Sequence, residues 1–476
     1  MALNIVIMAA GKGTRMKSAW PKVLHRLAGT SLLQHVLNAS AALGAARTVV
    51  ITGFGAEAVE AAVGAVTGSG VVFVRQMPQR GTGHAVQQAV PFLIDVDDAN
   101  ATTLILNGDV PLIRTATARA LVQACGGDKL ALLTIELADA TGYGRIVRNL
   151  QRSPGQPGQP GQPGHPIDHT VQAIVEHQDA TPAQRAIREV YTGIMAAPTA
   201  SLKRWVMALT NDNAQQEFYL TDIVAMAAAE GVAVVATPAT SETEVLGVNS
   251  PLQLAELERR FQRQQADALM EAGVRLADPA RLDIRGTLVC GSDVEIDVNC
   301  VFEGVVQMGD GVRIGANCVI RDAQIAAGAV IHAFSHIEGA SVGAGALIGP
   351  YARLRPGAVL GAEVHIGNFV EVKNSTLAKG AKANHLAYLG DATVGERVNF
   401  GAGSITANYD GAKKHRTTIG NDVHVGSNCV LVAPIRLGDG ATIGGGSTLS
   451  KDAPAGQLTV ARAKQVSLNG WVRPGK

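Results

Sequence analysis

Short apolar runs alternate with amphipathic stretches along the first half of the chain. The apolar runs have the length of buried strands, and the amphipathic stretches have the spacing of helices. The expected strands cover residues 3–7, 48–51, 71–74 and 103–106, and the expected helices between them cover 31–43 and 57–63. This alternation predicts a mainly parallel sheet with helices on both faces, a Rossmann-like α/β domain. In such a domain, ligands bind beyond the carboxyl ends of the strands.

A glycine-rich stretch, MAAGKGTRMKSAWPK over residues 8–22, directly follows the first apolar run. Gly11 and Gly13 remove side chains where backbone N–H groups would approach a phosphate. Basic side chains surround the same turn: Lys12, Arg15 and Lys22. The stretch contains neither a Walker A loop nor GxGxxG, and GKG alone would be a glycine turn with solvated basic residues. The whole stretch, placed after a strand, predicts a nucleotide-phosphate site.

Two more polar segments, 76–82 and 107–109, stand at expected strand ends. Asp109, taken alone, would be a turn or cap residue. Beside a triphosphate it becomes a candidate Mg²⁺ ligand, because Mg²⁺ takes few protein carboxylates and leaves its other positions to water and phosphate. Asn249, after a short strand expected over 244–246, could supply a second oxygen; the alternative is a residue that neighbours a helix cap.

Residues 153–164 are built of Gly-Gln-Pro units without an apolar residue. Such a composition cannot form a core, so we expect a mobile surface loop. It would lengthen a hairpin between 144–147 and 173–175, and we assign it no function.

A long helix is expected to separate two halves of the chain. Ser250 is a good cap with Pro251 at the first helical position, and Gly273 is a stop signal. The residues expected on its apolar side are Leu254, Leu257, Phe261, Ala268 and Leu269. The predicted organisation is therefore a domain over 1–249, a linker helix over 250–273 and a second domain over 274–476.

From about Val294 onward, aliphatic residues recur every six positions. The clearest members of this series are Met308, Ile314, Ile320, Val342, Ile348, Leu354, Leu360, Ile366, Val372, Ile419, Val425, Leu431, Leu437, Ile443 and Leu449. A six-residue period predicts a parallel β-helix, in which each short strand points one aliphatic side chain into a continuous core.

The six-residue period breaks twice, between Val372 and Val394 and between Phe400 and Ile419. Both intervals exceed three hexads, by four residues and by one residue. We expect them to hold insertions, which in solenoids form loops on a binding face. The polar residues of interest there are His385, Tyr388, Asn408 and Tyr409. For the basic run over 413–416, the simpler interpretation is a solvated loop tip.

Composition narrows the class of protein further. A chain of 476 residues needs two or more domains, and a formal net charge of +1 argues against a broad nucleic-acid-binding face. Aromatic residues make up 4% and glycines number 54, which suits tight turns and small repeating units. The five cysteines form no CxxC pair, and neither a signal peptide nor a membrane span is recognisable. We therefore expect a cytoplasmic protein.

Both halves resemble known enzyme families. The stretch over 8–22 resembles the signature of sugar-nucleotide pyrophosphorylases, and the hexads resemble the left-handed β-helix of hexapeptide-repeat acyltransferases. Proteins of the latter type are typically trimers with sites between subunits. The pairing is similar to the bacterial bifunctional enzymes that join a glucosamine-1-phosphate N-acetyltransferase to an N-acetylglucosamine-1-phosphate uridylyltransferase. The segments that carry this resemblance include QRGTGHA, GDVPL, TGYGRI, GVN, ARLRPG, GNFVEVKNS, NHLAYLGDA and GAGSITANYDG.

For the first half, the resemblance implies Mg²⁺-dependent uridylyl transfer from UTP to N-acetylglucosamine-1-phosphate with release of pyrophosphate. The residues it implies for UTP and the UDP-sugar are Met8, Ala9, Ala10, Gly11, Arg15, Lys22, Gln76, Gly81, Thr82, Asn107, Gly108, Gly144, Glu176 and Tyr191. Asp109 and Asn249 would hold Mg²⁺. Tyr191 stands where the family has asparagine, a departure at a sugar-contact position.

For the second half, the resemblance implies acetyl transfer from acetyl-CoA to the amine of glucosamine-1-phosphate, with His385 as general base. The residues implied for glucosamine-1-phosphate are Arg355, Lys373, Tyr388 and Asn399. Those implied for acetyl-CoA are Ala402, Asn408, Tyr409, Ser427, Gly445 and Arg462. Gly445 stands where the family often has alanine. The product, UDP-N-acetylglucosamine, would supply peptidoglycan and lipopolysaccharide synthesis.

Three alternatives stay open at this point. The first is a glucose- or mannose-1-phosphate nucleotidyltransferase with a shorter, regulatory β-helix and no acetyl transfer. The second is a non-catalytic assembly subunit, although Lys22, Asp109 and His385 are all present. The third is a histidine-metal β-helix enzyme such as a carbonic anhydrase, suggested by His332, His336, His365 and His385.

Overall fold

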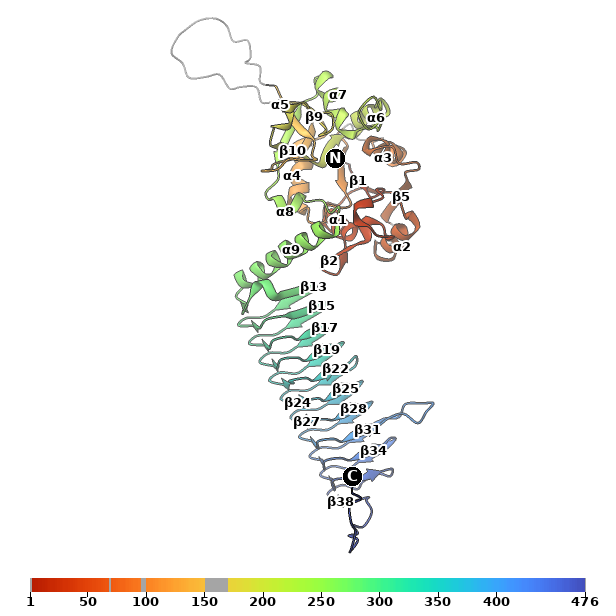
Figure 1. Cartoon of the computed structure of the whole chain (residues 1–476), viewed down its shortest axis with the longest axis vertical. Helices are drawn as coiled ribbons and strands as arrows, with labels where there is room; N and C mark the ends of the chain where they lie inside the picture. Colours follow the sequence, from red (N-terminus) through yellow and green to blue (C-terminus); the bar gives the residue numbers. More distant parts are fainter. Residues whose placement is uncertain (1, 68–69, 96–99, 150–169, 476) are drawn as a thin grey trace, which may run out of the picture. The chain divides into compact units, whose positions relative to one another are not determined.

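The computed structural model describes residues 2–67, 70–95, 100–149 and 170–475. The chain divides into two compact units, the first ending at Arg260 and the second beginning at Phe261 (Figure 1). Among the described residues, no helix is both long enough and apolar enough to span a bilayer.

The first unit is built on one twisted sheet with the strand order β11-β7-β10-β6-β1-β4-β5. Its strands are β1 (Leu3–Met8), β4 (Arg47–Thr52), β5 (Val71–Arg75), β6 (Thr102–Asn107), β7 (Leu130–Glu136), β10 (Glu189–Pro198) and β11 (Val234–Pro238). Strand β10 is antiparallel to its neighbours, and the other pairings along this order are parallel. The predicted Rossmann-like α/β fold is confirmed.

Helices cover both faces of this sheet because its strands are apolar on both sides. Ile105 and Ile51 pack in one core cluster, whereas Leu104 and Val50 pack in another. The helices and short elements are η1 (Thr14–Met16), η2 (Lys22–Leu24), the β2–β3 pair (Arg26–Leu27, Thr30–Ser31), α1 (Leu32–Ala41), α2 (Ala56–Thr67), α3 (Thr82–Ala89), η4 (Val90–Phe92), α4 (Thr115–Cys125), α5 (Pro182–Arg185), α6 (Thr199–Met207), η5 (Leu220–Asp222) and α7 (Ile223–Ala229).

The predicted hairpin is confirmed: β8 (Arg145–Arg148) pairs antiparallel with β9 (Val171–Val175), and β8 also pairs with β10. The Gly-Gln-Pro segment over 153–164 lies outside the described residues.

The short strand predicted over 244–246 is wrong. Ser241 and Glu244 form a capping box, and this pair of reciprocal hydrogen bonds begins helix α8 (Glu242–Val245). The capping signature is present in the sequence, and it overrides the β-branched and aliphatic residues of the segment.

Helix α9 (Pro251–Glu271) begins as predicted, because the Ser250 hydroxyl accepts a hydrogen bond of 3.2 Å from the Gln253 amide. Gly273 follows its end with a positive φ of 96°. Leu257 on its apolar side is buried, but Ala268 is exposed, so that part of the predicted apolar side is wrong.

The second unit is a parallel β-helix whose strands stack as successive rungs (Figure 1). The first ladder contains β12 (Arg275–Leu276), β14 (Glu295–Ile296), β16 (Arg313–Ile314), β18 (Val330–Ile331), β21 (Leu347–Ile348), β24 (His365–Asn368), β27 (Lys382–His385), β30 (Asn399–Phe400), β33 (His424–Val425), β36 (Thr442–Ile443) and β38 (Leu458–Thr459). A single-turn helix, η6 (Pro279–Arg281), precedes the first long strand.

The remaining strands form two further ladders that share the long strands at the start. The long strands are β13 (Leu282–Cys290), β15 (Cys300–Met308) and β17 (Val319–Ile325). The second ladder continues with β19 (His336–Glu338), β22 (Arg353–Leu354), β25 (Glu371–Lys373), β28 (Tyr388–Gly390), β31 (Ile405–Ala407), β34 (Val430–Val432) and β37 (Thr448–Leu449). The third continues with β20 (Ser341–Val342), β23 (Val359–Leu360), β26 (Thr376–Leu377), β29 (Ala392–Val394), β32 (Thr417–Ile419) and β35 (Ile435–Leu437).

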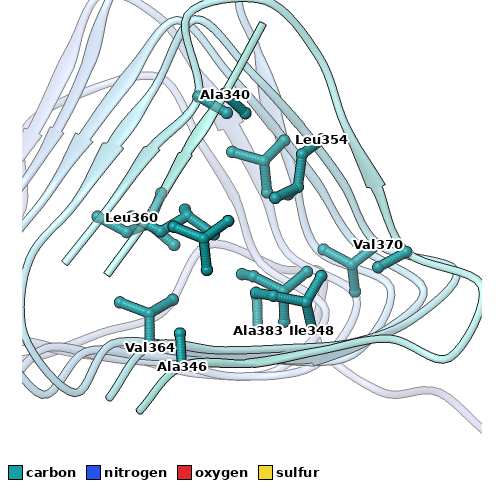
Figure 2. Close-up of a cluster of buried hydrophobic side chains, with 14 of the residues drawn as sticks. Ala340, Ala346, Ile348, Leu354, Leu360, Val364, Val370 and Ala383 are labelled. Carbon is teal, nitrogen blue, oxygen red and sulfur yellow. The ribbon is translucent and has the colours of Figure 1, made fainter. Parts of the chain in front are cut away.

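The aliphatic hexads fill the interior of this triangular coil. Ile348 pairs with Ile366 on the next rung, and Leu354 pairs with Val372; all four side chains are fully buried. Figure 2 shows this interior, with Leu360 and its neighbours pointing inward from three sides. The predicted left-handed β-helix of hexapeptide repeats is confirmed.

The first predicted insertion, between Val372 and Val394, is wrong. The inward-facing residues of this interval are all buried: Leu377, Ala383 and Leu389. They divide it into steps of five, six, six and five residues, so two corners are each one residue short and nothing is inserted. His385 and Tyr388 therefore lie on the regular strands β27 and β28.

The second predicted insertion is confirmed. Residues 408–416 leave the coil between β31 and β32, and Tyr409 forms an antiparallel bridge with Lys414 inside them. This segment is the hairpin drawn beside β31 in Figure 1.

Candidate active sites

Two adjoining pockets open at the carboxyl ends of the strands of the first unit. The larger has a volume of about 340 Å³, and the smaller about 210 Å³. The predicted residues that line the larger pocket are Met8, Ala9, Ala10, Gly11, Lys22, Gln76, Gly81, Thr82, Asn107 and Asp109. The predicted residues that line the smaller pocket are Met8, Thr82, Asn107, Gly144, Glu176 and Tyr191.

Two of the predicted nucleotide residues line neither pocket. Arg15 is exposed on η1. The Gly108 amide donates a hydrogen bond of 2.9 Å to the Met8 carbonyl, and this bond joins the ends of β6 and β1 beneath the pocket.

The glycine-rich turn brings Lys22 against the strand end. Gly13 has a φ of 58°, and a Cβ there would lie 2.6 Å from the Lys22 Cβ. A larger residue would push the lysine away, whereas a Cβ on Gly11 would meet nothing within 4 Å. Gly13 therefore serves the packing of Lys22, and Gly11 leaves its side of the turn open for a ligand.

Lys22, Asp109 and Asn249 converge at the edge of the larger pocket. The Lys22 ammonium contacts the Asp109 carboxylate and donates a hydrogen bond of 2.9 Å to Asn249 Oδ1. A backbone bond of 2.9 Å from the Val248 amide to the Asp109 carbonyl fixes the two segments to each other. Two oxygen ligands thus aim at a single cationic atom, an arrangement that fits a divalent ion with few protein ligands.

The smaller pocket contains a buried carboxyl and a buried phenol. Burial raises the pKa of Glu176, whose Oε1 accepts a hydrogen bond of 3.0 Å from the Thr221 hydroxyl. Burial also raises the pKa of Tyr191, and its hydroxyl has no hydrogen-bond partner among the described residues. Sequence reasoning missed Thr221, because it lies on a different element 45 residues from Glu176 and belongs to no recognised motif.

One corner of the β-helix stacks the predicted base with predicted acetyl-CoA residues. Backbone bonds link successive coils, from Gly403 to His385, from Asn428 to Ala402 and from Gly446 to Ser427. The corner column therefore contains Asn368, His385, Ala402, Ser427 and Gly445. Arg462 joins it by donating a hydrogen bond of 2.6 Å to the Gly445 carbonyl.

His385 is oriented by a residue that sequence reasoning missed. Its Nδ1 lies 2.9 Å from Asn368 Oδ1, one coil earlier. Because an amide oxygen only accepts, Nδ1 carries the hydrogen, and in the neutral imidazole Nε2 keeps a free lone pair. His385 itself is exposed, so that lone pair is accessible. Sequence reasoning missed Asn368 because the strand register, which only the structure supplies, sets the two residues opposite each other on adjacent rungs.

Basic side chains gather at the carboxyl ends of strands β22 and β25 of the second ladder. Lys414 lies beside Lys373, and the Lys414 ammonium lowers the pKa of Lys373. Arg355 is close by and donates a hydrogen bond of 2.8 Å to Glu371. Lys414 is exposed in its loop, as the interpretation of the basic run as a solvated loop tip expects, and it also adds a cation beside Lys373.

The loop over 408–416 is fastened to the coil next to it. Arg416 donates hydrogen bonds to the Thr393 hydroxyl (2.8 Å) and to the Ala392 carbonyl (3.1 Å). Asn408 is buried and bonds to Asp391, while Tyr409 is exposed. Asn408 and Tyr409 thus lie one corner away from Ala402, Ser427 and Gly445.

The predicted glucosamine-1-phosphate residues do not all meet within one chain. Tyr388 begins β28 on the second ladder, on the same face as Arg355 and Lys373. Asn399 lies on β30 in the first ladder, where its side chain contacts His424 at 3.1 Å.

No group of three or more His, Cys, Asp or Glu side chains is placed to hold a metal ion in the described part of the chain. The histidines at 332, 336, 365 and 385 therefore form no ligand set there, and the carbonic anhydrase alternative finds no support.

Three protein families match segments of the chain. A MobA-like NTP transferase domain matches residues 5–191, a GMPPB C-terminal domain matches 284–368, and the bacterial transferase hexapeptide (six repeats) matches 416–451. These matches cover both units separately.

Curated relatives match the chain from end to end. The bifunctional protein GlmU of Methylibium petroleiphilum is 73% identical over 100% of this chain and 99% of its own length. The protein of the same name from Albidiferax ferrireducens is 65% identical over the full length of both, and that of Bordetella parapertussis is 56% identical over 100% of this chain and 99% of its own. This chain therefore belongs to the GlmU family of bifunctional proteins.

Proposed function

We propose that this chain makes UDP-N-acetylglucosamine in two steps, one in each unit. The second unit transfers the acetyl group of acetyl-CoA to the amine of glucosamine-1-phosphate. The first unit then transfers the uridylyl group of UTP to the product and releases pyrophosphate. The observation that carries the proposal is the pair of separate residue clusters, Lys22 with Asp109 and Asn249 in one unit and His385 with Asn368 in the other.

In uridylyl transfer, a phosphate oxygen of N-acetylglucosamine-1-phosphate attacks the α-phosphorus of UTP. A new oxygen–phosphorus bond forms, the bond to the bridging oxygen of the β-phosphate breaks, and pyrophosphate leaves. No protein nucleophile is needed, so positioning and charge neutralisation supply the catalysis. Lys22 offsets phosphate charge, and the open backbone at Gly11 admits the phosphates close to the turn.

Asp109 and Asn249 would hold Mg²⁺, since their oxygens already aim at one cation. The ion would neutralise charge on the phosphate oxygens when bound. Lys22 then has to leave the two oxygens, and phosphate is the partner to which it would turn. The smaller pocket would receive the sugar, with Gly144, Glu176 and Tyr191 around it.

In acetyl transfer, the amine nitrogen attacks the thioester carbonyl carbon of acetyl-CoA. A carbon–nitrogen bond forms and the carbon–sulfur bond breaks, so CoA leaves as the thiol after it gains a proton. His385 Nε2 takes the proton that the amine loses, because Asn368 holds the hydrogen on Nδ1. Lys373 and Arg355, with Lys414 beside them, would bind the sugar phosphate.

We further propose a homotrimer in the cytoplasm. Within one chain, the predicted substrate residues are divided between two corners and two ladders of the β-helix. A neighbouring chain would bring together the residues that do not meet within one chain. We place uridylyl transfer in residues 1–249, the joining helix in 250–273 and acetyl transfer in 274–476.

The test supplies purified full-length protein with glucosamine-1-phosphate, acetyl-CoA, UTP and Mg²⁺. Free CoA and pyrophosphate should both appear, and pyrophosphate release should depend on acetyl-CoA when only the non-acetylated sugar is given. Pyrophosphate without CoA would contradict the two-step order. Sedimentation of the same sample checks the trimer independently of activity.

A further inference from the structure

We propose that Asp391 is a positioning residue of the acetyl-transfer site, because its buried carboxylate holds the loop over 408–416 in the direction that presents Asn408 and Tyr409 to acetyl-CoA. This role rests on the acetyl transfer proposed above, in which those two residues contact acetyl-CoA. Asp391 acts through them and contacts no substrate itself.

Asp391 lies in the turn between β28 and β29, with 7% of the residue exposed. Its two carboxylate oxygens have different partners. Oδ1 accepts a hydrogen bond from Asn374 Nδ2, and Oδ2 accepts one from Asn408 Nδ2. Asn374 belongs to the preceding coil, whereas Asn408 is the first residue of the loop. One side chain therefore joins the loop to two successive coils.

The ionised carboxylate also fixes the orientation of the Asn408 amide. Burial opposes the charge of Asp391, but hydrogen bonds from the two amides and the nearby ammonium groups of Lys373 and Lys414 lower its pKa. At neutral pH the carboxylate has no hydrogen to donate, so only Nδ2 of Asn408 can face it. The amide oxygen of Asn408 must then point away from Asp391.

The backbone of Asp391 holds the other end of the loop. The amide of Thr417, directly after the loop, donates a hydrogen bond of 3.1 Å to the Asp391 carbonyl. The Asp391 amide in turn donates one of 3.1 Å to the Lys373 carbonyl on the preceding coil. Both ends of the loop are therefore attached to Asp391.

Hydrogen bonds within the loop keep its shape. The Asp410 carboxylate accepts hydrogen bonds from the backbone amides of Ala412 and Lys413, at 2.8 Å and 2.6 Å. The His415 amide donates one of 2.9 Å to the Asn408 carbonyl. Because the loop is bonded to itself in this way, the contact that holds its first residue sets the direction of the whole loop.

Loss of the Asp391 carboxylate should affect acetyl-CoA more than the general base. Proton transfer depends on His385, which is held by Asn368 on the coil before it and not by the loop. A displaced loop should therefore weaken acetyl-CoA binding and leave the base in place. A residue with a structural role alone would lower stability without changing how an intact protein binds acetyl-CoA.

The experiment compares Asp391→Gly with Asp322→Gly in the full-length protein. Both residues have a positive φ, 49° and 45°, which glycine adopts without strain. Asp322 is a matched control, because it accepts a hydrogen bond of 2.9 Å from the Val305 amide at the same corner, several coils earlier. Initial rates of CoA release give kcat and KM. We expect the KM for acetyl-CoA to rise about tenfold in Asp391→Gly, with a smaller change in kcat, and to stay at the wild-type value in Asp322→Gly.

A double variant, Asn374→Asp with Asp391→Asn, tests the hydrogen bonds directly. It moves the carboxylate to the preceding coil, where the amide at position 391 can donate to it. The amide oxygen at position 391 can still accept from Asn408 Nδ2. Both hydrogen bonds and the net charge are kept, so the double variant should recover most of the wild-type KM for acetyl-CoA.

Thermal unfolding shows whether the second unit of each variant is intact. An intact Asp391→Gly protein with the wild-type KM for acetyl-CoA would overturn the inference, and so would a double variant as impaired as Asp391→Gly. Loss of the folded second unit in Asp391→Gly would assign Asp391 a structural role alone and would also overturn it. A wild-type protein that releases no CoA from acetyl-CoA and glucosamine-1-phosphate would instead contradict the proposed function.

Discussion

The two units assemble their candidate sites in opposite ways. In the first, Lys22 reaches Asp109 and Asn249 across 87 and 227 residues of chain. In the second, Asn368 and His385 are 17 residues apart and meet because they occupy the same place on successive coils. A parallel sheet gathers remote strand ends at one edge, whereas a solenoid stacks near neighbours. We therefore expect that a substitution in one site will lower the activity of that site alone.

The strongest test of that separation is His385→Ala. Removing the base should lower acetyl transfer by roughly a hundredfold to ten-thousandfold, the range for a general base. Uridylyl transfer from supplied N-acetylglucosamine-1-phosphate should stay near the wild-type rate, because no residue of the first site is changed. CoA release and pyrophosphate release, measured in separate assays, check this. Loss of both activities in a folded protein would show that the sites are not independent.

The mirror experiment is Asp109→Asn. The substitution removes the charge that faces Lys22 and one expected Mg²⁺ ligand, so uridylyl transfer should fall by about a hundredfold, while CoA release is unaffected. Asp128→Asn is the matched control, since Asp128 is an exposed aspartate in the turn between α4 and β7. A Mg²⁺ titration should require more metal in Asp109→Asn only. If both aspartate variants behaved alike, Asp109 would not be a metal residue.

A subtler effect is expected from Asn368→Ala. Without the acceptor at Nδ1, the His385 ring can exchange tautomers, and the fraction with a free Nε2 falls. One hydrogen bond is worth about 0.5–1.5 kcal/mol, so acetyl transfer should drop by about twofold to tenfold. The loss should lie in kcat, with little change in KM for acetyl-CoA. A change confined to KM would assign Asn368 to substrate binding.

The contrast between the two units also explains which of their features could be predicted from the sequence alone. The six-residue period predicted the buried column through Ile348 and Ile366, because each coil repeats one local pattern. The shortened corners between Val372 and Val394 were misread as an insertion, since a five-residue step is invisible without the strand register. The period of a solenoid shows the length of its repeat unit, whereas the strand register shows where a step is shorter than that unit.

In the first unit, the sequence predicted that the strand ends would share one ligand site, but not which side chains would touch there. Nothing local to Lys22 reveals that Asn249 lies beside it, because tertiary packing brings them together. The contact of 3.2 Å between Gln76 Nε2 and His84 Nδ1 has the same origin, since it depends on how the chain passes from β5 into α3. In the first unit, the family resemblance implied the roles of the site residues, and the structure showed which side chains they contact.

Two core substitutions, Ile105→Val in the sheet and Ile348→Val in the β-helix, should also distinguish the two units, with smaller effects than the substitutions above. Both side chains are fully buried, and each substitution should cost about 0.5–1.5 kcal/mol. In the sheet, Ile105 belongs to the central strand β6, so slow amides should lose protection throughout the first unit. In the β-helix, only the coils next to β21 should lose protection, because each coil contacts its neighbours alone. Native-state hydrogen exchange measures both patterns, and a uniform loss in the β-helix would contradict the nearest-neighbour picture.

The smallest expected effects are those of Glu176→Gln and Asp391→Asn, which should change the free energy of unfolding in opposite directions. Burial raises the pKa of Glu176, so its charge costs stability above that pKa and the cost is relieved as pH falls through it. Burial also opposes the charge of Asp391, but hydrogen bonds from Asn374 and Asn408 outweigh it and lower the pKa, so that carboxylate stabilises its unit until pH falls through the lowered value. At neutral pH, Glu176→Gln should therefore raise the free energy of unfolding of the first unit, and Asp391→Asn should lower that of the second. Both differences should shrink on acidification, that of Glu176 at the higher pH. Denaturant unfolding of each unit across this range checks the signs, and a stabilising Asp391→Asn would mean that burial outweighs the two amide hydrogen bonds.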